Sequence, residues 1–353
     1  MCLSLCIIIS CNIALTLGFE LSKKRCVFNN IDTTLVPVRT WIVIILFALI
    51  GICATIMNRG AYKGGFVSGI YVIINFFASY IDYLLVLILI ALYKKIKIPK
   101  FIYLLLFCIV FLQIDKLLIS VRRGEAIQFV LTLSFFYFFI HHKEIYHRYK
   151  FIIPFFFIVG MMLNSQIGKY RENSYSGKFS VIENINRIEI TNKGDSKSLK
   201  NLEMNNAMVG INYCFANGIY DYGTSNWNGL VQNFIPKSLF GSNFKDSLMF
   251  PNTNKSVIKK LTKSGSTMTG YFDAFASFGI FAFFKFFLLG LFMGVLWGKI
   301  EYSIISLLLY VASMSATLHT ITHSTNNIVS ELFFFFIFVY PFIKFCTVKT
   351  NFN

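Results

Sequence analysis

Hydrophobic positions along this chain gather in nine long runs, and all but one of the connections between them are short. The runs cover residues 2–19, 36–57, 66–93, 101–120, 126–140, 151–165, 271–297, 302–322 and 328–345. Most approach the roughly 20 apolar residues that an α-helix needs to cross a bilayer, while the fifth and sixth runs are shorter. The pattern predicts an all-α polytopic membrane protein with about nine transmembrane helices.

The exception is a polar stretch at residues 166–270, between the sixth and seventh predicted helices. It divides the chain into N-terminal membrane helices (1–165), one large loop (166–270) and C-terminal membrane helices (271–353). A membrane protein that only conducts or exchanges solutes keeps its loops short. A loop of this size indicates a protein that holds a polar substrate at the membrane face and acts on it there.

Composition supports the same class of protein. Hydrophobic residues make up 56% of the chain and charged residues only 14%, whereas soluble domains carry about a quarter charged residues. The net charge of +17 does not indicate a nucleic-acid partner, because the basic residues form short clusters at the ends of the apolar runs. The first run lacks a basic start and a small-residue cleavage site, so we interpret it as a membrane helix rather than a cleaved signal.

The distribution of Lys and Arg predicts the orientation. One set of alternate connections holds most of the basic residues, and the opposite set of short connections holds only Arg59, Lys63, Arg122 and Arg123. The first set comprises Lys23, Lys24, Arg25, Arg39, Lys94, Lys95, Lys97, Lys100, Lys143, Arg148, Lys150, Lys299, Lys344 and Lys349. Positive-inside bias places this set in the cytoplasm and the large loop outside.

Small residues recur at one helical face of the seventh predicted helix. Gly290, Gly294 and Gly298 are spaced four apart, which makes two overlapping GxxxG repeats. Because a face without side chains lets another helix approach closely, these glycines predict a helix contact and no chemistry.

Polar side chains at membrane depth are costly, which makes each one a hypothesis about function. Asp82 shares a helical face with Asn75 and Ser79 in the third predicted helix. Such a stripe suits either a proton-coupled transporter or a hydrogen-bond network between helices.

Arg122, Arg123 and Glu125 lie at the predicted outer junction of the fourth and fifth helices. They form either a snorkelling interfacial cluster or a phosphate site, since a guanidinium fork matches phosphate oxygens bidentately. Two adjacent arginines on the translocated side run against the positive-inside bias, and this favours the phosphate site.

His319 and His323 are four residues apart near the outer end of the eighth predicted helix. A metal site needs a third ligand or an HExxH pattern, and neither is visible, so no metal is predicted. A neutral histidine that accepts a proton, or a polar contact between helices, remains.

The large loop carries short basic and aromatic elements. It opens with Lys169 and Arg171 in GKYRENSYSG, and residues 199–220 have apolar side chains at helical spacing. The run LVQNFIPKSLF predicts an apolar helical turn that ends at Pro236, with Lys237 directly behind it. Cys214 is the single cysteine of this loop, which excludes a disulfide within it. No Walker loop, GxGxxG or GxSxG motif is present, so no cofactor or nucleotide chemistry is expected.

The order of these elements resembles that of bacterial O-antigen or capsule repeat-unit polymerases of the Wzy type. The resemblance covers the chain from about residue 104 onward. It is carried by RRGE at the end of a mid-chain helix, KYRE at the opening of the loop, YDYGTSNWNGL, FIPKSLF, and GSTMTGYFDAFASFG at the entry to the next helix. One departure is Lys237, where the family pattern has arginine, and a point charge there weakens bidentate phosphate binding.

The resemblance implies glycosyl transfer on the outer side of a bacterial cytoplasmic membrane. The substrate would be an undecaprenyl-diphosphate-linked oligosaccharide, and membrane lipids and a chain-length regulator protein would be the partners. It implies that Arg122, Arg123, Arg171 and, more weakly, Lys237 hold the diphosphate. Glu125, His319 and His323 are the candidate bases.

Three other classes of protein share part of this pattern. A flippase or other secondary transporter would show an internal repeat and broken helices, which the hydrophobic pattern does not reveal, and would lack the large loop. An acyltransferase would need a histidine facing its acyl donor, commonly on the cytoplasmic side. His319 and His323 lie on the predicted outer side instead. A glycan ligase shares nearly every feature, and the sequence separates it poorly from a polymerase.

Overall fold

The computed structural model describes residues 2–25, 32–58, 70–97, 99–120, 128–137, 203–251 and 268–350. Six helices in these ranges are long and apolar enough to cross a membrane: Cys2–Lys23, Pro37–Met57, Ile74–Tyr93, Gly270–Gly298, Ile304–Ile321 and Asn326–Cys346. Two shorter apolar helices, Lys100–Gln113 and Gln128–Tyr137, coincide with the fourth and fifth predicted runs. The chain is a multi-pass helical membrane protein. The predicted sixth helix at 151–165 lies outside the described residues.

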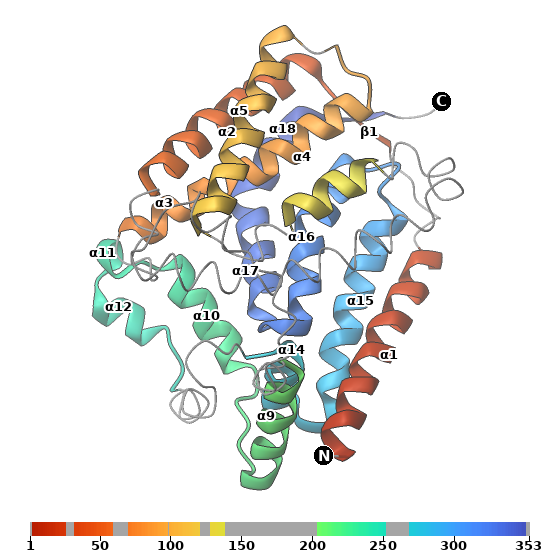
Figure 1. The fold of residues 1–353 in the computed structure, drawn as a ribbon, viewed down its shortest axis with the longest axis vertical. Coiled ribbons are helices and arrows are strands. Elements are labelled where there is room, and N and C mark those ends of the chain that lie inside the picture. The colour runs from red at the N-terminus through yellow and green to blue at the C-terminus, as the bar shows by residue number, and fades with distance from the viewer. Residues whose placement is uncertain are drawn as a thin grey trace, which may run out of the picture.

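Figure 1 shows the helices and strands of the described residues. The N-terminal part contains α1 (Cys2–Arg25), β1 (Asp32–Leu35), α2 (Pro37–Asn58), α3 (Ile70–Ala78), α4 (Tyr80–Tyr93) and α5 (Lys100–Ser120). The large predicted loop contains α9 (Glu203–Asn217), α10 (Thr224–Phe234), α11 (Lys237–Phe240) and α12 (Ser242–Ser247). The C-terminal part contains α14 (Gly270–Phe278), the 3-10 turn η4 (Gly279–Phe281), α15 (Ala282–Gly298), α16 (Ile304–Thr322), α17 (Asn326–Phe334), the π-helical turn η5 (Phe335–Val339), α18 (Tyr340–Cys346) and β2 (Thr347–Thr350).

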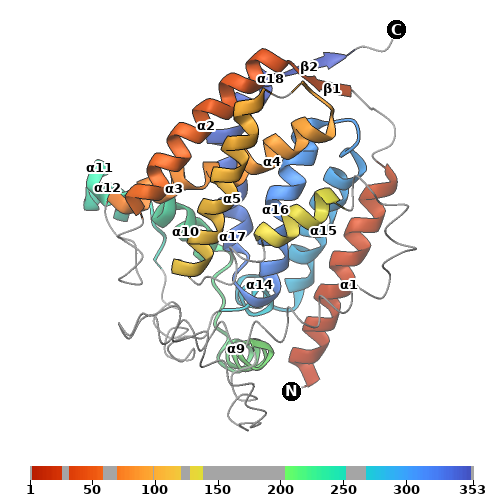
Figure 2. The same ribbon diagram turned by 45° about the horizontal axis from the view of Figure 1, so that its top comes forward.

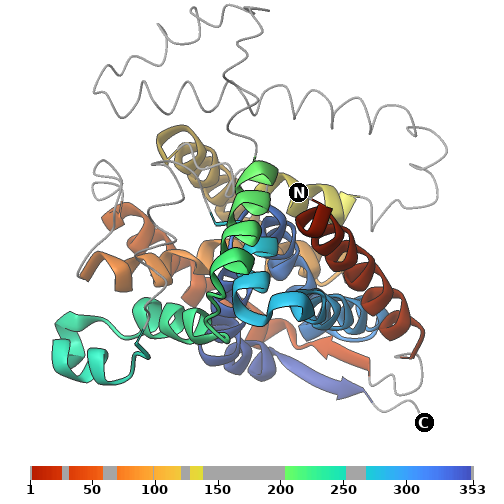
Figure 3. The same cartoon turned by 90° about the horizontal axis from the view of Figure 1, so that it is seen from below.

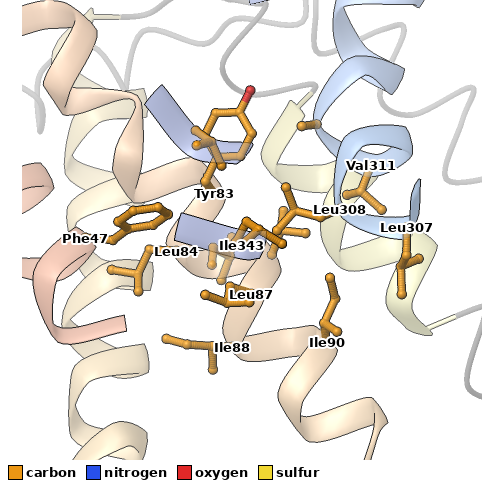
Figure 4. Close-up of a cluster of buried hydrophobic side chains, with 14 of the residues drawn as sticks. Phe47, Tyr83, Leu84, Leu87, Ile88, Ile90, Leu307, Leu308, Val311 and Ile343 are labelled. Carbon is orange, nitrogen blue, oxygen red and sulfur yellow. The ribbon is translucent and has the colours of Figure 1, made fainter. Parts of the chain in front are cut away.

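Helix α4 forms the centre of the larger hydrophobic core. Side chains on every side of it are buried, because α2, α5 and α16 all pack against it. Figure 4 shows Leu84 and Leu87 of α4 between Phe47 of α2 and Leu308 of α16. A helix that is apolar all round, as this sequence is, is the kind expected in the interior of a bundle.

Helices α1 and α15 pack together along their length (Figures 1 and 3). A Cβ atom at Gly290 would lie 2.1 Å from the carbonyl oxygen of Leu15, and one at Gly294 would lie 2.3 Å from that of Phe19. No side chain fits at these two positions, so the two backbones touch there. The predicted helix contact is confirmed at Gly290 and Gly294.

The expectation of unbroken helices is wrong at two places. The third predicted run divides at Ser79 into α3 and α4, and the seventh divides at Gly279 into α14 and α15. Gly279 has φ of +57°, a conformation that glycine adopts at no steric cost. A third irregularity is the π-helical turn before Pro341, whose missing N–H cannot continue the α-helical hydrogen-bond ladder.

Strands β1 and β2 pair antiparallel, with Asp32 opposite Thr350 and Leu35 opposite Thr347, and join the start of α2 to the end of α18. At the same end of the bundle, Arg39 donates a hydrogen bond to the carbonyl of Phe345 at 3.5 Å. Lys94 donates one to the carbonyl of Glu301 at 3.2 Å. This end, which we call the basic end, holds Arg39 and Lys94 of the basic set that the sequence grouped together. Helices α9 and α14 lie at the other end, the cap end (Figures 1 and 2).

Candidate functional site

The described part of the large predicted loop folds as helices against the cap end. Helix α9 packs on α14 and α1, so closely that a Cβ at Gly210 would lie 2.5 Å from the ring of Phe272. The N–H of Asp221 donates to the carbonyl of Ala276 in α14 at 2.8 Å. The predicted helical spacing at 199–220 is confirmed by α9, and α10 ends just before Pro236 as expected. This part of the loop is built into the bundle.

Helix α10 runs alongside α17. The amide nitrogen of Asn326 donates to the carbonyl of Ser225 at 3.3 Å, and that of Asn233 donates to the hydroxyl of Ser330 at 3.1 Å. Gly229 permits this approach, since a Cβ there would lie 2.4 Å from the Asn326 amide nitrogen. The loop thus contributes polar residues directly beside the start of a membrane helix.

Asp273 is the central charged residue of the region. Its Oδ2 lies 3.1 Å from Nζ of Lys285 and accepts a hydrogen bond from the backbone N–H of Thr325 at 3.0 Å. The Thr325 hydroxyl donates to the same oxygen. Asp273 is only 1% exposed. A carboxylate so deeply buried is stable only with partners such as these.

Local sequence explains why Asp273 sits there. The side chain of Thr269 caps α14 by accepting from the N–H of Phe272, which places Asp273 in the first turn, where a negative charge is favoured. Gly270 lets α14 touch α16, because a Cβ at this residue would lie 1.8 Å from the carbonyl oxygen of Thr320. We call the region where α10, α14, α16 and α17 meet the four-helix junction.

His319 and His323 end α16 at this junction. Their ring centroids are 5.4 Å apart, and the N–H of His323 donates to the carbonyl of His319 at 2.6 Å. The chain reaches Thr325, and with it Asp273, two residues later. His323 is therefore two residues along the chain from Thr325, the residue that binds Asp273. Among the residues that the structure describes, no group of three or more His, Cys, Asp or Glu could hold a metal ion.

Several buried polar atoms of the junction lack a hydrogen-bond partner within the described part of the chain. They are the hydroxyls of Ser225 and Ser277 and the amide oxygens of Asn226 and Asn326. Buried polar atoms are normally paired, and each exception calls for a partner such as water or a ligand. Together with a carboxylate, an ammonium and two imidazoles, these atoms can bind a hydroxyl-rich molecule and move a proton.

Five further site residues were predicted from the sequence. Arg122, Arg123, Glu125 and Arg171 lie outside the described residues. Lys237 is described but exposed, and it pairs with Asp246 at 3.9 Å.

The sequence did not reveal the Asp273–Lys285 pair. On a straight helix, Asp273 and Lys285 would lie about 18 Å apart, since they are twelve residues apart and each residue rises 1.5 Å. The break at Gly279 turns the chain and brings them to 3.1 Å. The available signal was that one apolar run contains two opposite charges, which rarely go unpaired in a membrane.

A second polar group lies inside the bundle. Gln113 of α5 donates to Oδ1 of Asp82 at 2.5 Å, and the hydroxyl of Tyr83 donates to Glu331 of α17. Tyr80 donates to the carbonyl of Phe338 at 2.9 Å. Of the two interpretations given for Asp82, the hydrogen bond from Gln113 of α5 supports a polar contact between helices.

No known family model, curated protein or solved structure matches this chain. The site must therefore be interpreted from its own residues, and the polymerase resemblance depends on the sequence motifs alone.

Proposed function

We propose that this protein is a glycosyltransferase of the bacterial cytoplasmic membrane. It would join undecaprenyl-diphosphate-linked oligosaccharide repeats into a surface polysaccharide, on the outer side of about nine membrane helices, alongside a chain-length regulator protein. The observation that carries the proposal is the four-helix junction at the end of the bundle opposite the basic end. There a buried ion pair, two histidines and unpartnered polar groups meet the polar segment of the loop.

The reaction needs an acceptor hydroxyl to lose its proton, a bond to form from that oxygen to the anomeric carbon, and the bond to the carrier diphosphate to break. We propose His319 or His323 as the proton acceptor, with Glu125 as the other candidate base. Arg122, Arg123 and Arg171 would stabilise the departing diphosphate, and Lys237 is the weaker candidate for this role. The hydroxyls and amides of the junction suit the acceptor sugar, whose polarity is of the same kind.

One observation favours a second candidate function, secondary transport. Helices α3–α4 and α14–α15 are broken, and the partly buried carboxyl groups of Asp82 and Glu331 form hydrogen bonds between helices of the bundle. Broken helices with ionisable residues near the membrane centre are the usual architecture of transporter binding sites. A transporter of lipid-linked oligosaccharide would act one step before polymerisation.

The test compares glycans in a strain that lacks this gene, complemented with the wild-type gene, with His319→Ala or with His323→Ala. Leu318→Ala is the matched control, since this exposed residue adjoins His319 on the same helix. We expect the deletion strain to display single repeats in place of a ladder, and at least one histidine variant to do the same at a normal protein level. Long polymer left on the carrier would indicate a ligase, and repeats trapped inside the cell would indicate a transporter.

A further inference from the structure

Helix α10 runs along α17 from the cap end toward the basic end. Its contacts with α17 progress from Ser225 beside Asn326 to Phe234, whose ring centroid lies 4.4 Å from that of Phe333. Asn326 and Phe333 are seven residues apart, which corresponds to about 10 Å along the helix. Phe234 also stacks on Phe76 of α3 at 4.9 Å. The end of α10 therefore lies at membrane depth, between the sides of two apolar helices.

The chain then turns and returns along the same path. Pro236 directly precedes α11, and Gly241, with φ of +82°, separates α11 from α12. On the return, Nζ of Lys245 donates to the carbonyl of Gln232 at 2.9 Å. Closer to the cap end, the indole N–H of Trp227 donates to the carbonyl of Leu248 at 2.8 Å. Residues 224–250 thus form a closed helical hairpin.

At the end of the hairpin near the four-helix junction, two reciprocal hydrogen bonds join its two arms. The Asn228 side chain donates to the carbonyl of Phe250 and accepts from its N–H, both at 2.9 Å. Asn228 is itself buried. These bonds close the hairpin near the four-helix junction and leave α11 and α12 at its far end, beside α3 (Figures 1 and 3).

The tip of the hairpin presents large apolar side chains away from the protein. Leu239 is 68% exposed, Phe240 55% and Phe244 49%, and the two phenylalanine rings stack at 5.8 Å. Phe234, at the end of α10, stacks on Phe76 of α3, and α3 packs on α2. The last turn of α2 has Ile56 and Met57 exposed in the same way, as expected of a surface that faces lipid.

We propose that residues 224–250 form a re-entrant hairpin whose tip, Leu239, Phe240 and Phe244, inserts between the acyl chains of the membrane leaflet at the cap end. The depth of about 10 Å matches that at which interfacial helices bury their apolar face. Lys237, exposed at the tip, can extend its ammonium to the lipid phosphates. Backbone at this depth needs hydrogen-bond partners, and Lys245, Trp227 and Asn228 bind carbonyl groups of the hairpin, which also packs on α17. The proposal depends on packing alone and holds whether the protein is a polymerase or a transporter.

Photolabelling in a bilayer tests this directly. The purified protein is reconstituted in phosphatidylcholine nanodiscs that contain a lipid with a diazirine near the acyl terminus, and labelled residues are mapped by mass spectrometry. Phe215 and Tyr222 are matched controls, because they belong to the same segment and are 56% and 79% exposed. We expect residues 237–247 to take up at least ten times more label than residues 213–222. Equal labelling of both stretches, or none at 237–247, would overturn the proposal.

A second measurement does not depend on the lipid probe. In nanodiscs, Phe240→Cys should react with a membrane-impermeant maleimide at least ten times more slowly than Tyr222→Cys, with each site quantified by its own peptide. Solubilisation in a short-chain detergent, which removes the bilayer, should bring the two rates within a factor of about three. Fast reaction of Phe240→Cys in nanodiscs would show a tip in water and refute insertion. Repeating the photolabelling in native membranes tests whether a protein partner covers the tip. A tip covered by protein would take up no lipid label, and this would refute insertion.

Discussion

Breaking the Asp273–Lys285 pair should show whether the four-helix junction is held together by charge. The three changes are Asp273→Asn, Lys285→Met and the two combined. Asp273 Oδ2 accepts from Lys285 at 3.1 Å and from the N–H of Thr325 at 3.0 Å, while Asp273 is 1% exposed. Lys285→Met leaves a buried carboxylate with hydrogen bonds from Thr325 alone. Asp273→Asn leaves an ammonium beside a neutral amide.

The magnitude follows from this burial. Removing one partner of a buried pair costs about 3–5 kcal/mol, because the other charge is left without compensation. The Lys285 side chain is 15% exposed and can reach toward solvent, so Asp273→Asn should cost about 3 kcal/mol, at the lower limit of that range. Lys285→Met should cost slightly more. The double variant should cost about 2 kcal/mol less than the sum of the single variants, since neither charge is then stranded.

Equilibrium unfolding by SDS titration in mixed micelles, followed by near-ultraviolet circular dichroism, measures the three free energies. The control is the exposed Lys23–Glu20 pair, separated by 3.9 Å, where Lys23→Met should change stability by less than about 1 kcal/mol. Strict additivity of the two junction variants would contradict a direct pair. Single variants as mild as the control would refute the argument that burial makes this pair essential.

Further outcomes are expected at three other places in the molecule. Gly290→Ala should destabilise the protein by about 1–3 kcal/mol in the same titration, because its Cβ would lie 2.1 Å from the Leu15 carbonyl oxygen; an unchanged midpoint would contradict the α1–α15 contact. Burial raises the pKa of the Cys214 thiol from 9.0 to about 11, which lowers its thiolate fraction near pH 8 about a hundredfold, so maleimide should label it only after unfolding. Cys214→Ala should also reduce the loss of stability between pH 9 and pH 11, since the folded state keeps this proton that the unfolded state releases. Reporter fusions at Lys193 and Lys97 should lie on opposite sides of the membrane, with Lys193 outside, and a common side would refute the predicted orientation.

Much of the fold could be predicted from the sequence because the bilayer imposes a simple rule. Apolar runs of spanning length become helices, since the backbone must satisfy its own hydrogen bonds in lipid. The glycines of α15 also predicted a helix contact, because a helix face without side chains lets another membrane helix approach closely. The partner, α1, could not be predicted, since GxxxG spacing describes one surface and does not specify which other helix meets it.

The candidate site was only half predictable. His319 and His323 stood out because polar residues are rare in such helices, and their i, i+4 spacing already placed them together. The Asp273–Lys285 pair depends on a chain break at Gly279, and hydropathy does not distinguish a broken helix from a straight one. The hairpin could not be predicted from hydropathy either. Its tip, KSLFGSNF, is polar enough to be taken as loop, and only the contacts of the preceding Phe234 with α17 and α3 show that it follows a segment packed between two apolar helices.

Helix α17 connects the two polar groups of the molecule, and this connection can separate the two candidate functions. Thr325, at its start, binds Asp273, and Glu331, six residues further, lies about 9 Å along the helix and accepts from Tyr83. A polymerase works at the junction and needs Glu331 only as a hydrogen-bond acceptor, a role that an amide oxygen fills. A proton-coupled transporter needs the carboxyl group itself, because an amide cannot take up or release the proton. Glu331→Gln should therefore keep a full ladder of glycan chains if the junction performs glycosyl transfer. Loss of surface glycan in Glu331→Gln, with repeats retained inside the cell and protein level unchanged, would favour transport instead.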